Sequence, residues 1–85
     1  MIMQQCTNDF ATSDFYLACF LRCEGYHLKD MKREGRRFVF VFEDRGERRQ
    51  DLLAFYNNTN PVPPLTFINA IKEMKSLIHD AKRAE

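Results

Sequence analysis

The stretch RRFVFVFE at residues 36–43 decides the fold of this 85-residue chain. Aromatic and β-branched side chains alternate along it with a period of two, which is the pattern that fits a pleated β-strand. Its three phenylalanines therefore share one face of the strand, and its two valines share the other. A strand with such an aromatic face must bury that face against other elements, so we interpret the rest of the chain around it.

A second strand is predicted directly before this stretch. Residues 26–33 show a shorter and imperfect pattern through Tyr26, Leu28 and Met31, and Glu34–Gly35 supplies a turn signal. We expect the two strands to form an antiparallel hairpin that helices cover on at least one side.

One helix is predicted before the hairpin in the sequence, and another directly after it. The first begins at Thr12–Ser13–Asp14, where short polar side chains can accept hydrogen bonds from the free N–H groups of a starting helix. It ends at Gly25, since glycine adopts the left-handed conformation common just past a helix. The second follows Asp44 and Glu47, which have the spacing of a capping box, and it ends in the polar run 57–60.

A third helix follows the prolines of the C-terminal part. Pro61 and Pro63 exclude helix before Pro64 or Leu65, while proline is well tolerated in a first turn. The helix is predicted to run to about Lys82. Its predicted apolar side consists of Phe67, Ile68, Ile71, Met74, Leu77, Ile78 and Ala81.

These elements predict a small single α+β domain with the order α-β-β-α-α, in which an antiparallel β-hairpin packs against three helices. The domain spans residues 12–85. Residues 1–11 show no sustained period, and we expect them to form a flexible N-terminal arm. A chain of 10.1 kDa has room for one domain, and hydrophobic residues at 45% of the chain, including eight phenylalanines, are enough to close one core.

Charge and composition exclude several classes of protein. Thirteen basic and twelve acidic residues leave a net charge of +1, well short of the balance typical of proteins held to nucleic acid by phosphate neutralisation. No apolar run is long enough to cross a bilayer, and the start of the chain lacks the regions of a signal peptide. The three cysteines are an odd number without a C-x-x-C pair, which fits reduced thiols. We therefore expect a cytoplasmic protein.

Four strings of sequence carry a resemblance to a known family. They are TSDFYLA at 12–18, EGYHLKD at 24–30, FVFVFED at 38–44 and PPLTFINAIKEMKSLI at 63–78. Together they resemble the small bacterial and phage-associated domain of unknown function 5659, over roughly residues 12–79. The resemblance implies a fold and a cytoplasmic setting in a prokaryote or a mobile element. It brings no activity, substrate or catalytic residue to transfer.

The cysteines allow one alternative to ordinary core thiols. Cys19 and Cys23 lie on one helical face, and with His27 and Cys6 they would make a Cys₃His set for zinc. However, Gly25 is expected to end the helix before the histidine, and cysteine is among the residue types most often buried. The sequence favours core thiols, and we expect neither a metal nor another cofactor.

Basic side chains gather at the predicted hairpin tip, at the start of the second helix and along the last helix. Cationic groups beside a sheet that carries aromatic rings hold single strands of nucleic acid in several small folds. Acidic residues are interspersed, and so a solvated edge that discourages strand aggregation is the favoured interpretation. The candidate binding surface consists of Lys32, Arg33, Arg36, Arg37, Arg45, Arg48, Arg49, Lys72 and Lys75.

On the last helix, the basic residues form a stripe opposite the predicted apolar side. Lys72, Lys75, His79 and Lys82 recur every three or four residues. Glu73 and Asp80 lie beside them, so a solvated helix face is the favoured interpretation here as well.

The chemical inventory argues against catalysis. The chain has two histidines and lacks a glycine-rich phosphate loop, a nucleophile-elbow motif and a distinctive carboxylate pair. We therefore expect no enzyme.

What remains is a binding module. Tyr16, Tyr26, Phe55 and Tyr56 are expected near the edges of elements, and protein interfaces are enriched in aromatic residues and arginine. We expect a protein–protein surface, in an adaptor, a homo-oligomer or a phage or mobile-element inhibitor of a host complex. The alternative is single-stranded nucleic-acid binding through the arginine-rich hairpin tip.

Overall fold

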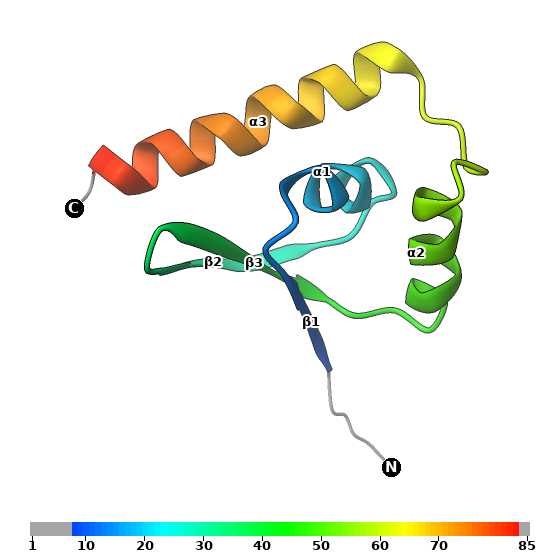
Figure 1. Ribbon diagram of the computed structural model, residues 1–85, viewed down its shortest axis with the longest axis horizontal. Helices are drawn as coiled ribbons and strands as arrows, with labels where there is room; N and C mark the ends of the chain where they lie inside the picture. The colour runs from blue at the N-terminus through cyan, green and yellow to red at the C-terminus, as the bar shows by residue number, and fades with distance from the viewer. Residues whose placement is uncertain (1–7, 84–85) are drawn as a thin grey trace.

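The computed structural model describes residues 8–83, which form three helices and a three-stranded antiparallel sheet (Figure 1). The predicted α+β class is therefore confirmed. In chain order the elements are β1 (Asp9–Thr12), α1 (Phe15–Cys23), β2 (Leu28–Glu34), β3 (Arg37–Glu43), α2 (Arg48–Tyr56) and α3 (Pro64–Arg83).

The structure contains a strand, β1, that the predicted order α-β-β-α-α lacks, so that order is wrong at its start. Strand β1 pairs antiparallel with β3, with Phe10 opposite Phe42 and Thr12 opposite Phe40, so that β3 is the central strand in the order β1-β3-β2. The expectation of a flexible arm is thus wrong for residues 9–11, while residues 1–7 lie outside the described part of the chain. Four residues are too short to show an alternation. They become a strand because β3 offers them an edge with unpaired N–H and C=O groups.

The predicted hairpin of β2 and β3 is confirmed. The two strands pair antiparallel up to Glu34 and Arg37, and a shift of register interrupts the pairing between Leu28 and Asp30. Gly35 has φ of +65° at the turn, a conformation that favours glycine. The turn therefore requires the residue that marked it in the sequence.

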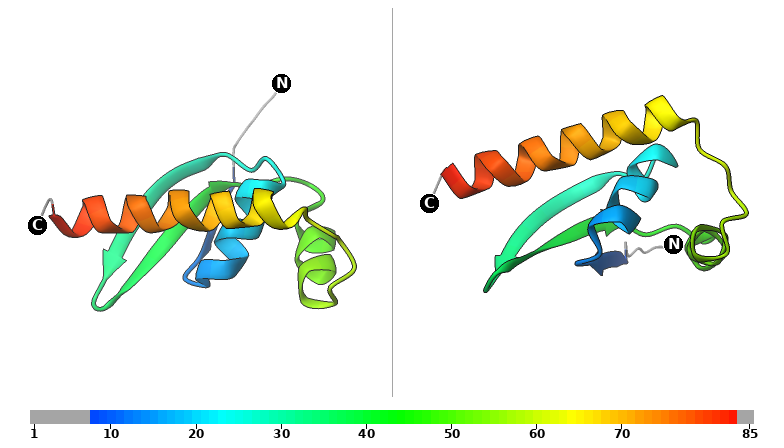
Figure 2. Two further views of the ribbon diagram at one scale, coloured as in Figure 1. Left: turned by 90° about the horizontal axis from the view of Figure 1, so that it is seen from above. Right: turned by 45° about the horizontal axis from the view of Figure 1, so that its top comes forward.

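Helix α1 lies between the sheet and α3, and both helices are on the same side of the sheet (Figure 1 and the right view of Figure 2). The carboxylate of Asp14 accepts a hydrogen bond from the backbone N–H of Leu17 at 3.1 Å, and Gly25 follows the helix with φ of +88°. Both predicted ends are therefore confirmed. Residues 17–21 are all buried, because α1 is covered from more than one direction.

The core lies where the aromatic face of β3 meets α1 and α3. Phe38, Phe40 and Phe42 are buried there as predicted, together with Ala70 and Met74 of α3. The opposite face of β3 carries Val39 and Val41, and no helix formed by residues 8–83 lies over it (Figure 2).

Helix α2 lies at the end of the sheet and packs against α1 (Figure 1). The capping box predicted at its start is wrong. The helix begins at Arg48, and the side chain of Glu47 makes no cap bond. Asp44 instead accepts hydrogen bonds from the backbone N–H of Arg45 and from Nε of Arg48, at 2.8 and 2.9 Å. The bond from Arg48 is the main reason that the pKa of Asp44 lies below its usual value.

Helix α3 has the predicted extent but buries a narrower side than predicted. Met74 is fully buried, whereas Ile68 and Leu77 are 43% and 37% exposed. The reason is that α3 covers the domain from one side, so only one stripe of it meets other elements. No helix among residues 8–83 is long and apolar enough to cross a membrane.

Candidate functional site

An open apolar hollow of about 360 Å³ lies where α1, α2 and the start of α3 meet. We call it the α2–α3 hollow. It is lined by Phe20, Phe55, Asn58, Val62, Pro64, Phe67 and Ile68. The rings of Phe20 and Phe55 pack with their centroids 5.0 Å apart. The proline-containing segment connects α2 to α3, as seen at the right of Figure 1.

Large apolar side chains remain exposed beside this hollow. Ile68 lines the hollow itself, and Leu65, 72% exposed, lies one turn before it on α3. Tyr56 is 62% exposed, and its ring packs against that of Phe55 at 5.2 Å. Contiguous exposed apolar side chains around a concavity mark interaction sites more often than isolated ones do. The α2–α3 hollow is therefore the strongest candidate for a binding site.

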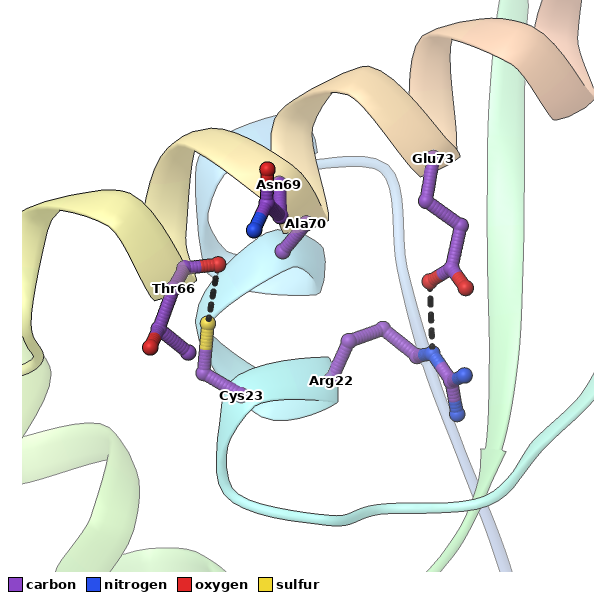
Figure 3. Close-up of a pocket in the computed structure, with 6 residues that line it drawn as sticks. All are labelled: Arg22, Cys23, Thr66, Asn69, Ala70 and Glu73. Atoms are coloured by element: carbon purple, nitrogen blue, oxygen red, sulfur yellow. Dashed lines mark hydrogen bonds and ion pairs between the residues drawn. The ribbon is translucent and has the colours of Figure 1, made fainter.

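A second hollow, of about 290 Å³, lies between α1 and α3, and Figure 3 shows the side chains that line it. Its polar groups bond to one another. Nε of Arg22 lies 3.3 Å from the carboxylate of Glu73, and Sγ of Cys23 donates to the carbonyl oxygen of Thr66 at 3.8 Å. These contacts tie α1 to α3, which gives the second hollow a structural role.

The thiols fall in two different environments. Cys19 is fully buried in the core, whereas Cys23 lies at the second hollow and His27 is exposed. Among residues 8–83 there is no group of three or more His, Cys, Asp or Glu side chains that could hold a metal ion. Cys6 lies outside the described residues. Burial, and to a lesser extent the neighbouring Cys23, raises the pKa of the Cys19 thiol to about 11.

This raised pKa predicts a loss of stability in alkali. Between pH 9 and 11 the unfolded chain releases the Cys19 proton while the folded chain retains it, so the free energy of unfolding should fall as pH rises through that window. Below pH 9 the contribution is fully present. Urea unfolding measured at several pH values from 7 to 10 gives the free energy of unfolding as a function of pH. This free energy should decline less steeply with pH for Cys19→Val than for the wild type. Equal slopes would contradict the assignment.

The predicted cationic residues fall into separate groups. Lys32, Arg33, Arg36 and Arg37 are exposed at the hairpin tip. The tip and α2 lie at opposite ends of the molecule in every view (Figures 1 and 2). The basic residues around the start of α2 therefore share no surface with the tip. Lys72 and Lys75 are exposed on α3.

Two of the arginines near α2 make intramolecular contacts with aromatic rings, carbonyl oxygens or a carboxylate. The guanidinium of Arg45 lies over the ring of Tyr26 at 4.3 Å and donates to the carbonyl oxygens of Glu24 and Gly25. That of Arg48 lies over the ring of Phe10 at 4.5 Å and pairs with Asp44. Both hold loops and strands together, whereas Arg49 is exposed.

Tyr26 lies near the edge of an element, two residues before β2, but it is not accessible to a partner. The side chain is fully buried, and its hydroxyl donates to the carboxylate of Asp51 at 2.6 Å. Burial and this hydrogen bond raise the pKa of the phenol. Tyr16 and Tyr56 are exposed, as expected.

The α2–α3 hollow itself was missed at the level of sequence. The apolar residues of α3 include Leu65, Phe67 and Ile68 in its first turns, an arc wider than one buried stripe can absorb. That excess, next to a proline-rich segment, was the available signal.

No curated protein and no solved structure matches the chain. The family described as domain of unknown function (DUF5659) matches residues 7–80. This span includes β1 and the four sequence strings between residues 12 and 78 that carry the resemblance. Because this match covers most of the chain, the protein belongs to the DUF5659 family.

Proposed function

We propose that the protein is a non-catalytic binding module that docks a partner protein on the α2–α3 hollow. The observation that carries this proposal is the exposure of Leu65, Ile68 and Tyr56 around a hollow lined almost entirely by apolar side chains. The module acts in the cytoplasm as an adaptor, as a homo-oligomer or as an inhibitor of a host complex encoded by a phage or mobile element.

The chemistry of the hollow supports a protein as the occupant. Interfaces are anchored by aromatic and aliphatic side chains that enter pockets and exclude water. The α2–α3 hollow offers the faces of Phe20 and Phe55 to such an anchor, and Asn58 supplies one polar group at its border. The hollow is open, which suits a side chain projecting from a surface.

Site-specific cross-linking tests the proposal. A photoreactive phenylalanine analogue placed at Ile68 should, in cells that naturally contain the protein, yield one discrete cross-linked polypeptide on irradiation. A product of twice the chain mass would identify self-association, and a product of any other mass would identify a different partner. Mass spectrometry of the product identifies both components.

The matched control places the same analogue at Gln50, an exposed polar position on α2 that does not line the hollow. Cross-linking there should be weak or absent. Equal products at both positions, or none at Ile68, would contradict docking at the hollow.

A second candidate function rests on the hairpin tip. Three exposed basic residues, Lys32, Arg36 and Arg37, lie within six positions of the sequence at the hairpin tip. This density of positive charge suits the binding of phosphate groups. The phenylalanines of β3 are buried in the core, so the tip would bind single-stranded nucleic acid through phosphates without base stacking on them.

Replacing Arg33, Arg36 and Arg37 by serine tests this second function. If the tip binds phosphates, the affinity for a single-stranded oligonucleotide should fall steeply with salt, by about 0.7 log units per contact for each log unit of salt. The triple variant should then bind more weakly and with a flatter salt dependence, as measured by fluorescence anisotropy. Undetectable binding of the wild type at low salt would eliminate this candidate.

A further inference from the structure

A basic stripe on α3 begins at the α2–α3 hollow. Ile68, which lines the hollow, is followed by Lys72, Lys75, His79 and Lys82 at spacings of four, three, four and three residues. These spacings place all five side chains along one flank of the helix, so the stripe adjoins the apolar side at Ile68 and does not lie opposite it as predicted. Over the 14 residue steps from Ile68 to Lys82 the stripe extends about 21 Å.

The acidic residues of α3 do not neutralise this stripe. Glu73 pairs with Arg22 of α1 at 3.3 Å, and Asp80 lies 4.0 Å from the guanidinium of Arg83, so neither carboxylate pairs with a lysine of the stripe. Within residues 8–83, the structure shows no ion pair to Lys72, Lys75 or Lys82. The flank that starts at the hollow is therefore apolar at one end and uniformly basic along the rest.

We propose that the partner docks through an acidic amphipathic segment that lies along α3. Its apolar side chains occupy the α2–α3 hollow, and its carboxylates face Lys72, Lys75 and Lys82. This inference rests on the proposed function and specifies its partner. A helical segment of about four turns matches the length of the stripe, and apolar anchors at i, i+3 and i+4 are the usual way in which such a segment fills a groove.

The apolar start of the stripe favours this partner over nucleic acid. A single strand could satisfy the lysines with its phosphates and stack a base on a phenylalanine of the hollow, but Asn58 is the one polar residue in the lining that could bond to the polar edge of that base. An acidic amphipathic segment satisfies both parts of the flank at once. Complementary charge of this kind sets the register and the specificity of an interface.

The test is a selection from a phage-displayed library of random 16-residue peptides on the full-length protein. Enriched sequences should combine large apolar residues near one end with Asp or Glu at spacings of three and four. A synthetic peptide of the enriched sequence is then measured against variants by fluorescence anisotropy, with circular dichroism to verify that each variant is folded.

The double variant Lys72→Glu/Lys75→Glu should weaken this peptide about 5- to 30-fold, the range for two exposed ion pairs replaced by like-charge contacts. A peptide with its acidic residues replaced by lysine should bind the double variant better than it binds the wild type. The matched control, Lys32→Glu/Arg37→Glu, makes the same change of net charge on the sheet face opposite α3 and should leave the affinity unchanged.

The outcomes separate the inference from the proposed function. Apolar peptides without acidic residues, sensitive to Ile68→Glu but not to the double variant, would overturn the acidic partner and leave docking at the hollow intact. No enrichment, or peptides insensitive to Ile68→Glu, would overturn both. Displacement of the peptide by a single-stranded oligonucleotide that binds more tightly, and that the double variant no longer binds, would assign the stripe to nucleic acid.

Discussion

Replacing Phe40 by alanine should lower the free energy of unfolding by about 3–5 kcal/mol. Phe40 lies on the central strand, opposite Thr12 of β1 and Met31 of β2, and its side chain is 1% exposed. Its ring also packs near that of Phe15, with centroids 6.4 Å apart. Truncation therefore leaves a cavity between the sheet and α1, where neither layer is free to collapse into it.

Chemical denaturation followed by circular dichroism measures this loss. Domains of this size have stabilities near the lower end of the usual range of about 5–15 kcal/mol, so the variant should be close to unfolded at 37 °C. The control is Val39→Ala on the neighbouring residue of β3, which points to the opposite face and is half-buried. It should cost about 1 kcal/mol. Similar losses for the two variants would show that the aromatic face is not the core.

Replacing Met74 by alanine should produce the second largest loss, about 2–5 kcal/mol. Met74 is fully buried near the middle of α3 and belongs to the same core as Phe40. It is the large side chain through which α3 closes the core over α1. Without it, the helix keeps the small buried side chain of Ala70 and half-buried residues such as Ile71 and Ile78.

Leu77→Ala is the matched control on the same helix, because Leu77 was also predicted on the apolar side but is 37% exposed. Its replacement should cost about 1 kcal/mol or less. Thermal and urea denaturation of both variants distinguish the positions. A larger loss for Leu77→Ala than for Met74→Ala would mean that α3 is rotated relative to the described packing.

The secondary structure was predictable where local chemistry acts within a few residues. The period of two in residues 36–43, the cap at Asp14 and the turn at Gly35 each depend on side chains that bond to, or constrain, their own neighbourhood. The wrong capping box shows the limit of that reasoning. Asp44 had the right spacing, but Arg48 competes for its carboxylate.

The candidate site was less predictable, because it joins segments far apart in the chain. The α2–α3 hollow brings Phe20 beside Phe55 and Ile68, which no local pattern relates. Likewise, Arg45 resembled a surface cation in the sequence, and only the folded chain places it over Tyr26.

The sequence by itself determined the α+β class, the aromatic core face of β3, the ends of α1 and the reach of α3. Each of these follows from periodicity or from hydrogen bonding between near neighbours. Tertiary structure alone decided that residues 9–12 add a third strand, because so short a segment becomes a strand only through pairing with the free edge of β3. It also decided that Ile68 stays exposed while Met74 is buried, since helical periodicity defines an arc of apolar residues and only the packed neighbours select the part that loses contact with water.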